Sequence, residues 1–236
     1  MSASALAAVL WDMDGTLVDT EGYWMAAEIM LVKRFGGTWS HEQALQLVGK
    51  GLEDSARIFQ DAGVRMGITE IVDQLTDDVM GQLATKGVPF RPGAQELLAG
   101  LREAGVKTAL VTMSLRRMAE TVVDLMDFTA FDVIIAGDDS TRPKPFPDPY
   151  LQACDALGVL PRDAVAIEDS PTGLRSAVAA GAAVIGVPLM VSIAGAGAHT
   201  VWPTLEGRTA ADVAQFHSGH LAARHAGREA ARGDIR

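Results

Sequence analysis

The sequence predicts an α/β fold with a three-layer, Rossmann-like core, in which helices cover both faces of a parallel sheet and a small α-helical cap domain is inserted. Two observations predict it. Short apolar segments alternate with helical segments along most of the 236-residue chain, an order that favours parallel strands joined by crossover helices. Residues 20–88 interrupt that order, because they contain helical patterns and no convincing strand.

Four of the five predicted strands are mainly apolar runs that end in polar residues. The expected strands cover residues 6–11, 106–113, 133–136, 164–167 and 183–187. In a parallel sheet the site lies beyond the carboxyl ends of the strands. The polar residues that follow these runs are therefore expected to lie together at one edge of the sheet.

The predicted helices of the core lie between these strands, and a second set fills the insert. Core helices are expected over residues 94–104, 116–126, 147–157, 172–180 and 210–216. Helices of the insert are expected over residues 23–35, 41–48, 52–62 and 69–84. Glycines such as Gly105, Gly158 and Gly181 follow three of the core helices and are typical helix stops.

The domain boundaries follow from this alternation. Residues 1–19 and 89–216 are predicted to form the α/β core, residues 20–88 the helical cap, and residues 217–236 a flexible tail. The tail is rich in Ala, His and Arg and has little apolar face. His217, His220 and His225 fit no standard metal motif, so a solvated tail is favoured over a metal site there.

Composition narrows the class of protein. A hydrophobic content of 48% allows a substantial core, and the net charge of −10 argues against a nucleic-acid partner. The single cysteine, Cys154, cannot form an intrachain disulfide and reads as a core thiol in a reducing compartment. No signal peptide and no membrane-spanning run of about 20 apolar residues is recognised, so the cytoplasm is expected.

Two carboxylates follow the first predicted strand. Asp12 and Asp14 are two residues apart, a spacing that places side chains on one face of an ideal strand. Alone, this pair is also compatible with a structural role, as an acidic turn with a helix cap. Other strand ends and loops strengthen the chemical interpretation by adding a hydroxyl donor, a cation and further carboxylates: Thr112, Ser114, Lys144, Glu168 and Asp169.

These residues carry a resemblance to a known family. The segment Asp12-Met-Asp-Gly-Thr-Leu-Val-Asp19, then Thr112, then Lys144-Pro-Phe-Pro-Asp-Pro149, then Ile167-Glu-Asp-Ser-Pro-Thr-Gly173 resemble, in order, four motifs of the haloacid dehalogenase superfamily. The match runs from about residue 6 to about residue 213. Within the superfamily the chain is similar to the branch of sugar-phosphate phosphatases and β-phosphoglucomutases that carry a helical cap.

The resemblance implies a role for each core residue. Asp12 would attack phosphorus and form an aspartyl-phosphate, and Asp14 would protonate the leaving oxygen and then activate water. Thr112, the backbone amide of Met113, and Lys144 would hold phosphate oxygens. Magnesium would be held by the Asp12 carboxylate, the Asp14 backbone carbonyl and the Asp169 carboxylate, an oxygen-only set that suits this ion. Glu168 would ligate through water or orient Asp169.

The cap is expected to close over the site and to contact the substrate. Lys50 and Glu53 lie in or next to a glycine-flanked loop and are candidates for binding sugar hydroxyls, with a solvated helix–helix turn as the alternative. Trp24 stands where mutases of this branch have a histidine, which favours a phosphatase; it is also compatible with the cap core. Arg116 is expected either to face the pocket or to lie on the surface.

The sequence therefore predicts a phosphoric monoester hydrolase, a phosphatase that uses magnesium and acts on a small phosphorylated metabolite, as a monomer or homodimer. Dehalogenases of the superfamily have the pattern Asp-x-Tyr at the first motif, whereas this chain has Asp14 in place of the tyrosine. Two alternatives remain. One is a phosphosugar mutase, and the other is a non-catalytic binding protein on the same scaffold.

Overall fold

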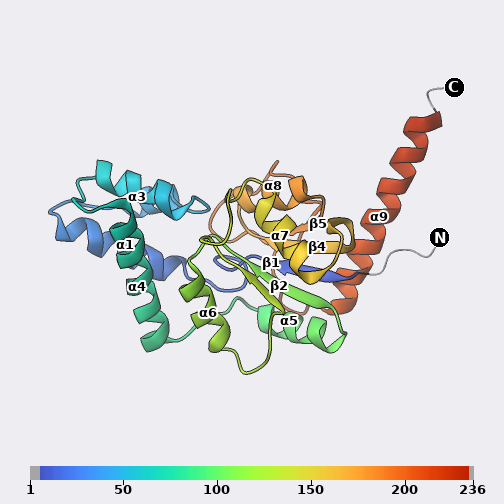
Figure 1. Ribbon diagram of the computed structural model, residues 1–236, viewed down its shortest axis with the longest axis horizontal. Coiled ribbons are helices and arrows are strands. Elements are labelled where there is room, and N and C mark those ends of the chain that lie inside the picture. Colours follow the sequence, from blue (N-terminus) through green and yellow to red (C-terminus); the bar gives the residue numbers. More distant parts are fainter. Residues whose placement is uncertain (1–5, 234–236) are drawn as a thin grey trace.

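The computed structural model describes residues 6–233 and contains a parallel sheet between two layers of helices (Figure 1). In this range the sheet has six strands in the order β3-β2-β1-β4-β5-β6, all parallel. Their bounds are β1 Ala8–Trp11, β2 Lys107–Val111, β3 Val133–Ile135, β4 Ala164–Glu168, β5 Ala183–Gly186 and β6 Thr200–Val201. The predicted α/β fold is confirmed.

The register of the central strands aligns their carboxyl ends. Trp11, the last residue of β1, pairs with Leu110 on one side and with Ile167 on the other. The residues that follow these three positions are Asp12, Val111 and Glu168, and they therefore lie at the same level, at the carboxyl edge of the sheet. This alignment brings segments more than 90 residues apart in the sequence to one edge.

Two apolar layers fill the space between the sheet and its helices. Side chains alternate along β1, so that Val9 and Trp11 pack on one face and Ala8 and Leu10 on the other. The first face is covered by α5 (Ala94–Glu103), α6 (Arg116–Asp124) and the start of α9 (Ala210–Gly233). The second face is covered by α7 (Asp148–Leu157) and α8 (Pro171–Ala180). Cys154 is buried in this second layer, as predicted, and burial raises the pKa of its thiol to about 11.

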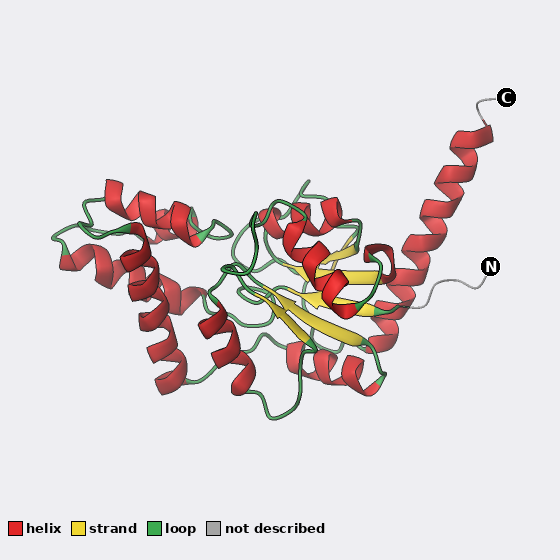
Figure 2. Cartoon of the chain, in the orientation of Figure 1, coloured by secondary structure: helices red, strands yellow, loops and turns green. Residues whose placement is uncertain are grey.

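The insert forms an all-helical body beside the sheet, at the left of the view in Figure 2. It contains α1 (Glu21–Arg34), α2 (His41–Leu45), α3 (Leu52–Asp61) and α4 (Ile68–Lys86). Its interior is apolar, and the rings of Trp39 and Phe59 lie 4.9 Å apart, centroid to centroid. We refer to residues 20–88 as the cap.

The structure differs from the sequence-based expectation in its last third. A two-residue strand, β6, follows the small-residue loop, and a 3₁₀ turn at Pro161–Asp163 precedes β4; neither was predicted. The last helix was expected to end at Phe216 but continues to Gly233, because its many alanines and arginines are good helix formers. Residues 1–5 and 234–236 of the predicted core and tail lie outside the described residues.

The histidines of this helix are not all in a solvated segment, contrary to expectation. His217 is buried, with Nε2 at 3.0 Å from the carbonyl oxygen of Arg162. The ring of His220 contacts that of His199, whereas His225 is exposed. Among the residues described, no helix is both long and apolar enough to cross a bilayer.

Candidate active site

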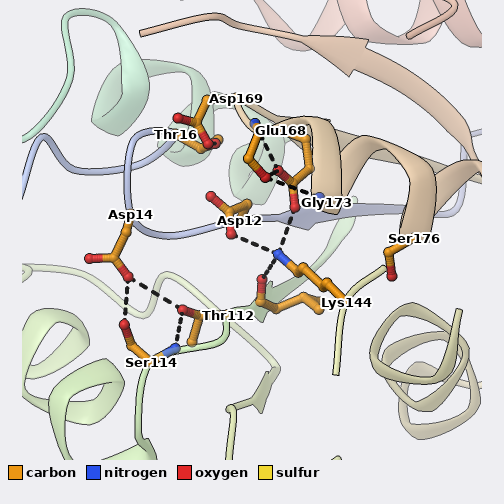
Figure 3. A network of polar contacts seen from close by, with 12 residues as sticks. Asp12, Asp14, Thr16, Thr112, Ser114, Lys144, Glu168, Asp169, Gly173 and Ser176 are labelled. Atoms are coloured by element: carbon orange, nitrogen blue, oxygen red, sulfur yellow. Dashed lines mark hydrogen bonds and ion pairs between the residues drawn. The ribbon is translucent and has the colours of Figure 1, made fainter. Parts of the chain in front are cut away.

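Lys144 lies at the centre of a buried polar cluster at the carboxyl edge of the sheet. Its Nζ donates hydrogen bonds to Asp12 Oδ1 at 2.7 Å, to Glu168 Oε1 at 2.6 Å and to the carbonyl oxygen of Val111 at 2.9 Å (Figure 3). The three acceptors come from the ends of β1, β2 and β4. All three donor positions of the ammonium group are therefore used to hold this edge together.

The charges in this cluster perturb one another strongly. Burial raises the pKa of Asp12, Glu168 raises it further, and Lys144 opposes the shift. Burial alone would lower the pKa of Lys144, but Asp12 and Glu168 outweigh it and raise this pKa. Burial also raises the pKa of Asp169, helped by the charges of Asp12 and Glu168. Three carboxylates share one lysine, so the cluster lacks positive charge.

This cluster fits a divalent cation. One carboxylate oxygen from each of Asp12, Glu168 and Asp169 lies within 4.8 Å of the others. Gly15 has a φ of +86°, and a Cβ there would come 2.0 Å from Asp169 Oδ2, so only glycine permits this approach. An all-oxygen donor set with excess negative charge suits a hard cation such as Mg²⁺.

Asp14 lies in a different environment, although it is only two residues from Asp12. Its Oδ2 accepts hydrogen bonds from the Ser114 hydroxyl at 2.7 Å and, weakly, from the Thr112 hydroxyl at 3.5 Å. Its Oδ1 accepts from the Thr20 hydroxyl and from Trp24 Nε1 at 3.2 Å. Neutral donors thus hold Asp14, whereas a cation and other carboxylates surround Asp12.

Several residues that support the cluster were not identified from the sequence. The hydroxyl of Tyr150, which is fully buried, donates to Glu168 Oε1 at 2.7 Å. Arg91 donates from Nη1 to the carbonyl oxygens of Gly15 and, at 2.9 Å, Val187. Tyr150 belongs to an amphipathic helix and Arg91 follows the return from the cap, so neither stands out by spacing. Only the Pro-rich approach to α7 hinted that this segment is held rigidly.

A cavity of about 100 Å³ lies between this cluster and the cap. Its core side contains Asp12, Asp14, Thr112, Met113, Ser114, Lys144 and Asp169. Its cap side contains Glu21, Trp24, Glu28, Leu47, Lys50, Ser55 and Phe59, among others. The predicted residues of the core thus line one cavity together with Trp24 and Lys50 of the cap, except Glu168, which is fully buried and reaches the site through Lys144.

Two candidate residues lie outside the cavity, which corrects the expectation for Glu53 and agrees with the surface alternative for Arg116. Glu53 does not line the cavity: its side chain is 77% exposed and pairs with Arg57 one turn along α3. The first turn of α3 directs this position to solvent. Arg116 also lies outside the cavity, because its guanidinium is held by Asp139, Glu120 and the carbonyl oxygen of Ile134.

Comparison with protein-family models matches residues 9–187 to the haloacid dehalogenase-like hydrolases. Hexitol phosphatase A of Escherichia coli is 31% identical over 185 residues, which cover 75% of this chain and 81% of that protein. The bifunctional riboflavin kinase/FMN phosphatase of Arabidopsis thaliana is also 31% identical over 185 residues, and these cover 76% of this chain. The chain spans about half of that longer protein, 48%.

Among solved structures, a variant of CbbY from Rhodobacter sphaeroides in complex with xylulose-1,5-bisphosphate is similar to this chain, with a TM-score of 0.79 and 29% identity. The match covers 87% of this chain and 98% of that one. The stretch that matches the family model contains the whole buried cluster, from Asp12 to Asp169.

Proposed function

The chain belongs to the haloacid dehalogenase-like hydrolases, and on this premise we propose that it is a magnesium-dependent phosphatase that hydrolyses a small sugar phosphate. The observation that carries the proposal is the contrast between Asp12 and Asp14. Asp12 lies in the metal-suited cluster of carboxylates around Lys144, whereas Asp14 lines the same cavity and is held by neutral donors. Two carboxyl groups in contrasting environments are suited to two different roles.

Asp12 is the proposed nucleophile. Lys144 holds its Oδ1, which fixes the orientation of the carboxylate. The attack transfers the phosphoryl group to Asp12 and forms an aspartyl-phosphate, which divides the hydrolysis into two easier steps. The Thr112 hydroxyl and the Met113 backbone amide lie around the same cavity and are the proposed donors to the phosphate oxygens. Lys144, whose ammonium group already binds Asp12, Glu168 and Val111, would attract the phosphate through its charge.

Asp14 is the proposed general acid and base. In the first step it donates a proton to the leaving oxygen of the sugar. In the second step it takes a proton from the water that attacks the aspartyl-phosphate, so its initial protonation state is restored. Ser114, Thr20 and Trp24 hold its two oxygens and set the direction of the carboxyl group.

Asp12, Asp169 and the Asp14 backbone carbonyl would hold magnesium, with Glu168 orienting the site. The ion would neutralise charge on the transferred phosphoryl group and reduce its repulsion by Asp12. The mutual repulsion among the buried carboxylates supports this assignment, because a cation relieves it.

Magnesium should therefore stabilise the protein in a pH-dependent manner. The raised pKa values of Asp12 and Asp169 mean that the metal-free folded protein binds more protons than the unfolded chain. Its stability should fall as pH rises from about 4 into the neutral range. Protons also compete with the ion, so the rise in Tm on adding Mg²⁺ should be larger at pH 8 than at pH 5.5. An equal rise at both values, measured by differential scanning fluorimetry, would argue against a site made of these carboxylates.

Trp24 and the intact carboxylate pair distinguish the phosphatase from its alternatives. The indole of Trp24 donates to Asp14, and the related mutases have a histidine at the position of Trp24. A non-catalytic member would be expected to lack the nucleophile or the acid, yet Asp12 and Asp14 are both present and oriented.

A phosphate-release screen over phosphorylated sugars, polyols and other small metabolites tests the proposal. We expect release from at least one monophosphate in the presence of Mg²⁺ and its loss in EDTA, with recovery when Mg²⁺ is restored. Isomerised sugar phosphate without release would indicate the mutase. Absence of both reactions across the screen, including with an aryl phosphate, would contradict the proposed function.

A further inference from the structure

The cap side of the cavity carries a buried carboxylate to which no role has yet been given. Glu28 is 7% exposed and lies on α1, seven residues after Glu21 and four after Trp24. Positions separated by three, four and seven residues share one face of a helix, and all three side chains line the cavity. Helix α1 therefore presents two carboxyl groups and the indole that holds Asp14.

Trp39 fixes the direction of the Glu28 carboxylate. Its Nε1 donates to Glu28 Oε2 at 3.0 Å, and its ring packs against Phe59 in the cap interior. Glu28 Oε1 has no hydrogen-bond partner among the described residues. The hydroxyl of Ser55, on α3, lines the same cavity and likewise has no protein partner there.

The surroundings of Glu28 make this arrangement costly for the free protein. Much of the rest of the cap side of the cavity is apolar, with Leu47, Phe59, Val72 and Leu75 among its lining residues. Burial raises the pKa of Glu28 to about 7, against the hydrogen bond from Trp39 that lowers it. Glu28 Oε1 is not among the fully buried unpaired atoms of the described residues, so it is accessible from the cavity. The carboxylate is nevertheless partly desolvated, and a ligand hydroxyl would supply a hydrogen bond to this oxygen.

We propose that Glu28 is a specificity-determining residue whose free oxygen binds a hydroxyl of the leaving group, and that the cap selects neutral polyol or sugar monophosphates. This inference rests on the proposed phosphatase function. The orientation by Trp39 makes Glu28 a preformed acceptor, and a preformed acceptor discriminates strongly against ligands that leave it unpaired.

The same face disfavours a second anionic group on the substrate. Glu21 and Glu28 both lie on it, so the residues of α1 that line the cavity supply two carboxyl groups and no cation. Lys144 is already bound to Asp12 and Glu168, which leaves Lys50 as the other cationic side chain lining the cavity. A sugar bisphosphate, such as the ligand of the CbbY structure, would place a second phosphate near these carboxyl groups.

Three phosphate esters separate the features of the leaving group: a hexitol 6-phosphate, n-hexyl phosphate without hydroxyls, and a hexose 1,6-bisphosphate. In Glu28→Ala we expect kcat/KM for the hexitol phosphate to fall by about 10- to 100-fold, the effect of one hydrogen bond to a charged group. The value for hexyl phosphate should be unchanged. Glu28→Gln keeps an acceptor for Trp39 and should lose less on the hexitol phosphate, while its rate on the bisphosphate rises.

Two further variants complete the test. Trp39→Phe keeps an aromatic ring against Phe59 but removes the donor to Glu28 and part of the indole volume, so it should lower the preference for hexitol over hexyl phosphate. Glu42→Gln removes an exposed cap carboxylate and should leave all three rates unchanged. Thermal unfolding of each variant confirms that it is folded, and Glu28→Gln and Trp39→Phe carry the test if Glu28→Ala does not fold.

The inference is overturned if Glu28→Ala lowers both the hexitol and hexyl rates by the same factor, or if it leaves the hexitol rate unchanged. A wild-type preference for the bisphosphate over the hexitol phosphate would also overturn it. These outcomes differ from failure of the proposed function. In that case the wild type would release no phosphate from any of the three esters, and none from an aryl phosphate.

Discussion

Asparagine in place of Asp12 should reduce phosphate release to background, with a fall in kcat of about 10⁴-fold or more, the scale seen when a covalent nucleophile is removed. The substitution keeps the shape of the side chain but removes the nucleophilic carboxylate. It also removes an anionic partner of Lys144 and one of the proposed ligands of the metal. Steady-state phosphate release on the best substrate of the screen measures the effect.

Asp61→Asn provides the matched control for this substitution. Asp61 is an exposed residue of the cap, at the end of α3, and removing its charge should leave kcat unchanged. Both variants should show cooperative thermal unfolding, which excludes misfolding as the cause of lost activity. Residual kcat in Asp12→Asn within tenfold of the wild type would be incompatible with Asp12 as nucleophile.

Replacement of Asp14 by asparagine should lower kcat on a sugar phosphate by ~10²–10⁴-fold, the typical contribution of a positioned proton donor or acceptor. The amide oxygen can still accept hydrogen bonds from Thr20 and Trp24, and the amide nitrogen can donate to the hydroxyl oxygen of Ser114, so the local structure should be preserved. It can neither protonate the leaving oxygen nor deprotonate water. The loss should therefore depend on how much the leaving group needs a proton.

An aryl phosphate separates the two roles of Asp14. Its leaving group departs without a proton, so the first step in Asp14→Asn should remain fast while hydrolysis of the aspartyl-phosphate becomes slow. We expect a rapid burst of about one aryl alcohol per active site, followed by a slow steady rate. Ser114→Ala, which removes one of the four donors to Asp14, should show a smaller loss and no burst. A uniform loss on aryl and sugar phosphates would contradict the assignment.

The core of the site was predictable because its residues lie at the ends of strands. Each strand is a short apolar run, and parallel strands in register deliver their following residues to one edge. Trp11 pairs with Leu110 and Ile167, which are all buried. Asp12 and Glu168 come directly after their paired residues, and Thr112 comes two residues after Leu110. Lys144 comes from a loop, but its Pro-rich surroundings marked it as a fixed residue.

The cap contacts were less predictable, because they depend on how helices rotate and pack. Glu53 and Arg116 both lie at helix starts near the site in sequence, yet each is held by partners outside the cavity. Glu28 was not identified, because a glutamate in the middle of a helix normally indicates a solvated face. Only the packing of Trp39 against Phe59 reveals that this position is buried.

The last helix, α9, was also less predictable than the core of the site. Residues 217 to 225 lack an obvious apolar stripe, which predicted a solvated tail. His217 is nevertheless buried, and its burial depends on a tertiary contact with the carbonyl group of Arg162, which precedes β4. Helix propensity extends α9, but no local pattern indicates which of its histidines reach the core.

Direct detection of the phosphorylated residue tests the mechanism most sharply. Asp14→Asn is mixed with the aryl phosphate and Mg²⁺, quenched in acid during the burst, digested and analysed by mass spectrometry. We predict one phosphoryl group on the peptide that carries Asp12, and its absence when Asp12→Asn is added to the same variant. A phosphoryl group on another residue, or a full burst with no phosphorylated peptide, would contradict the proposal that Asp12 is the nucleophile.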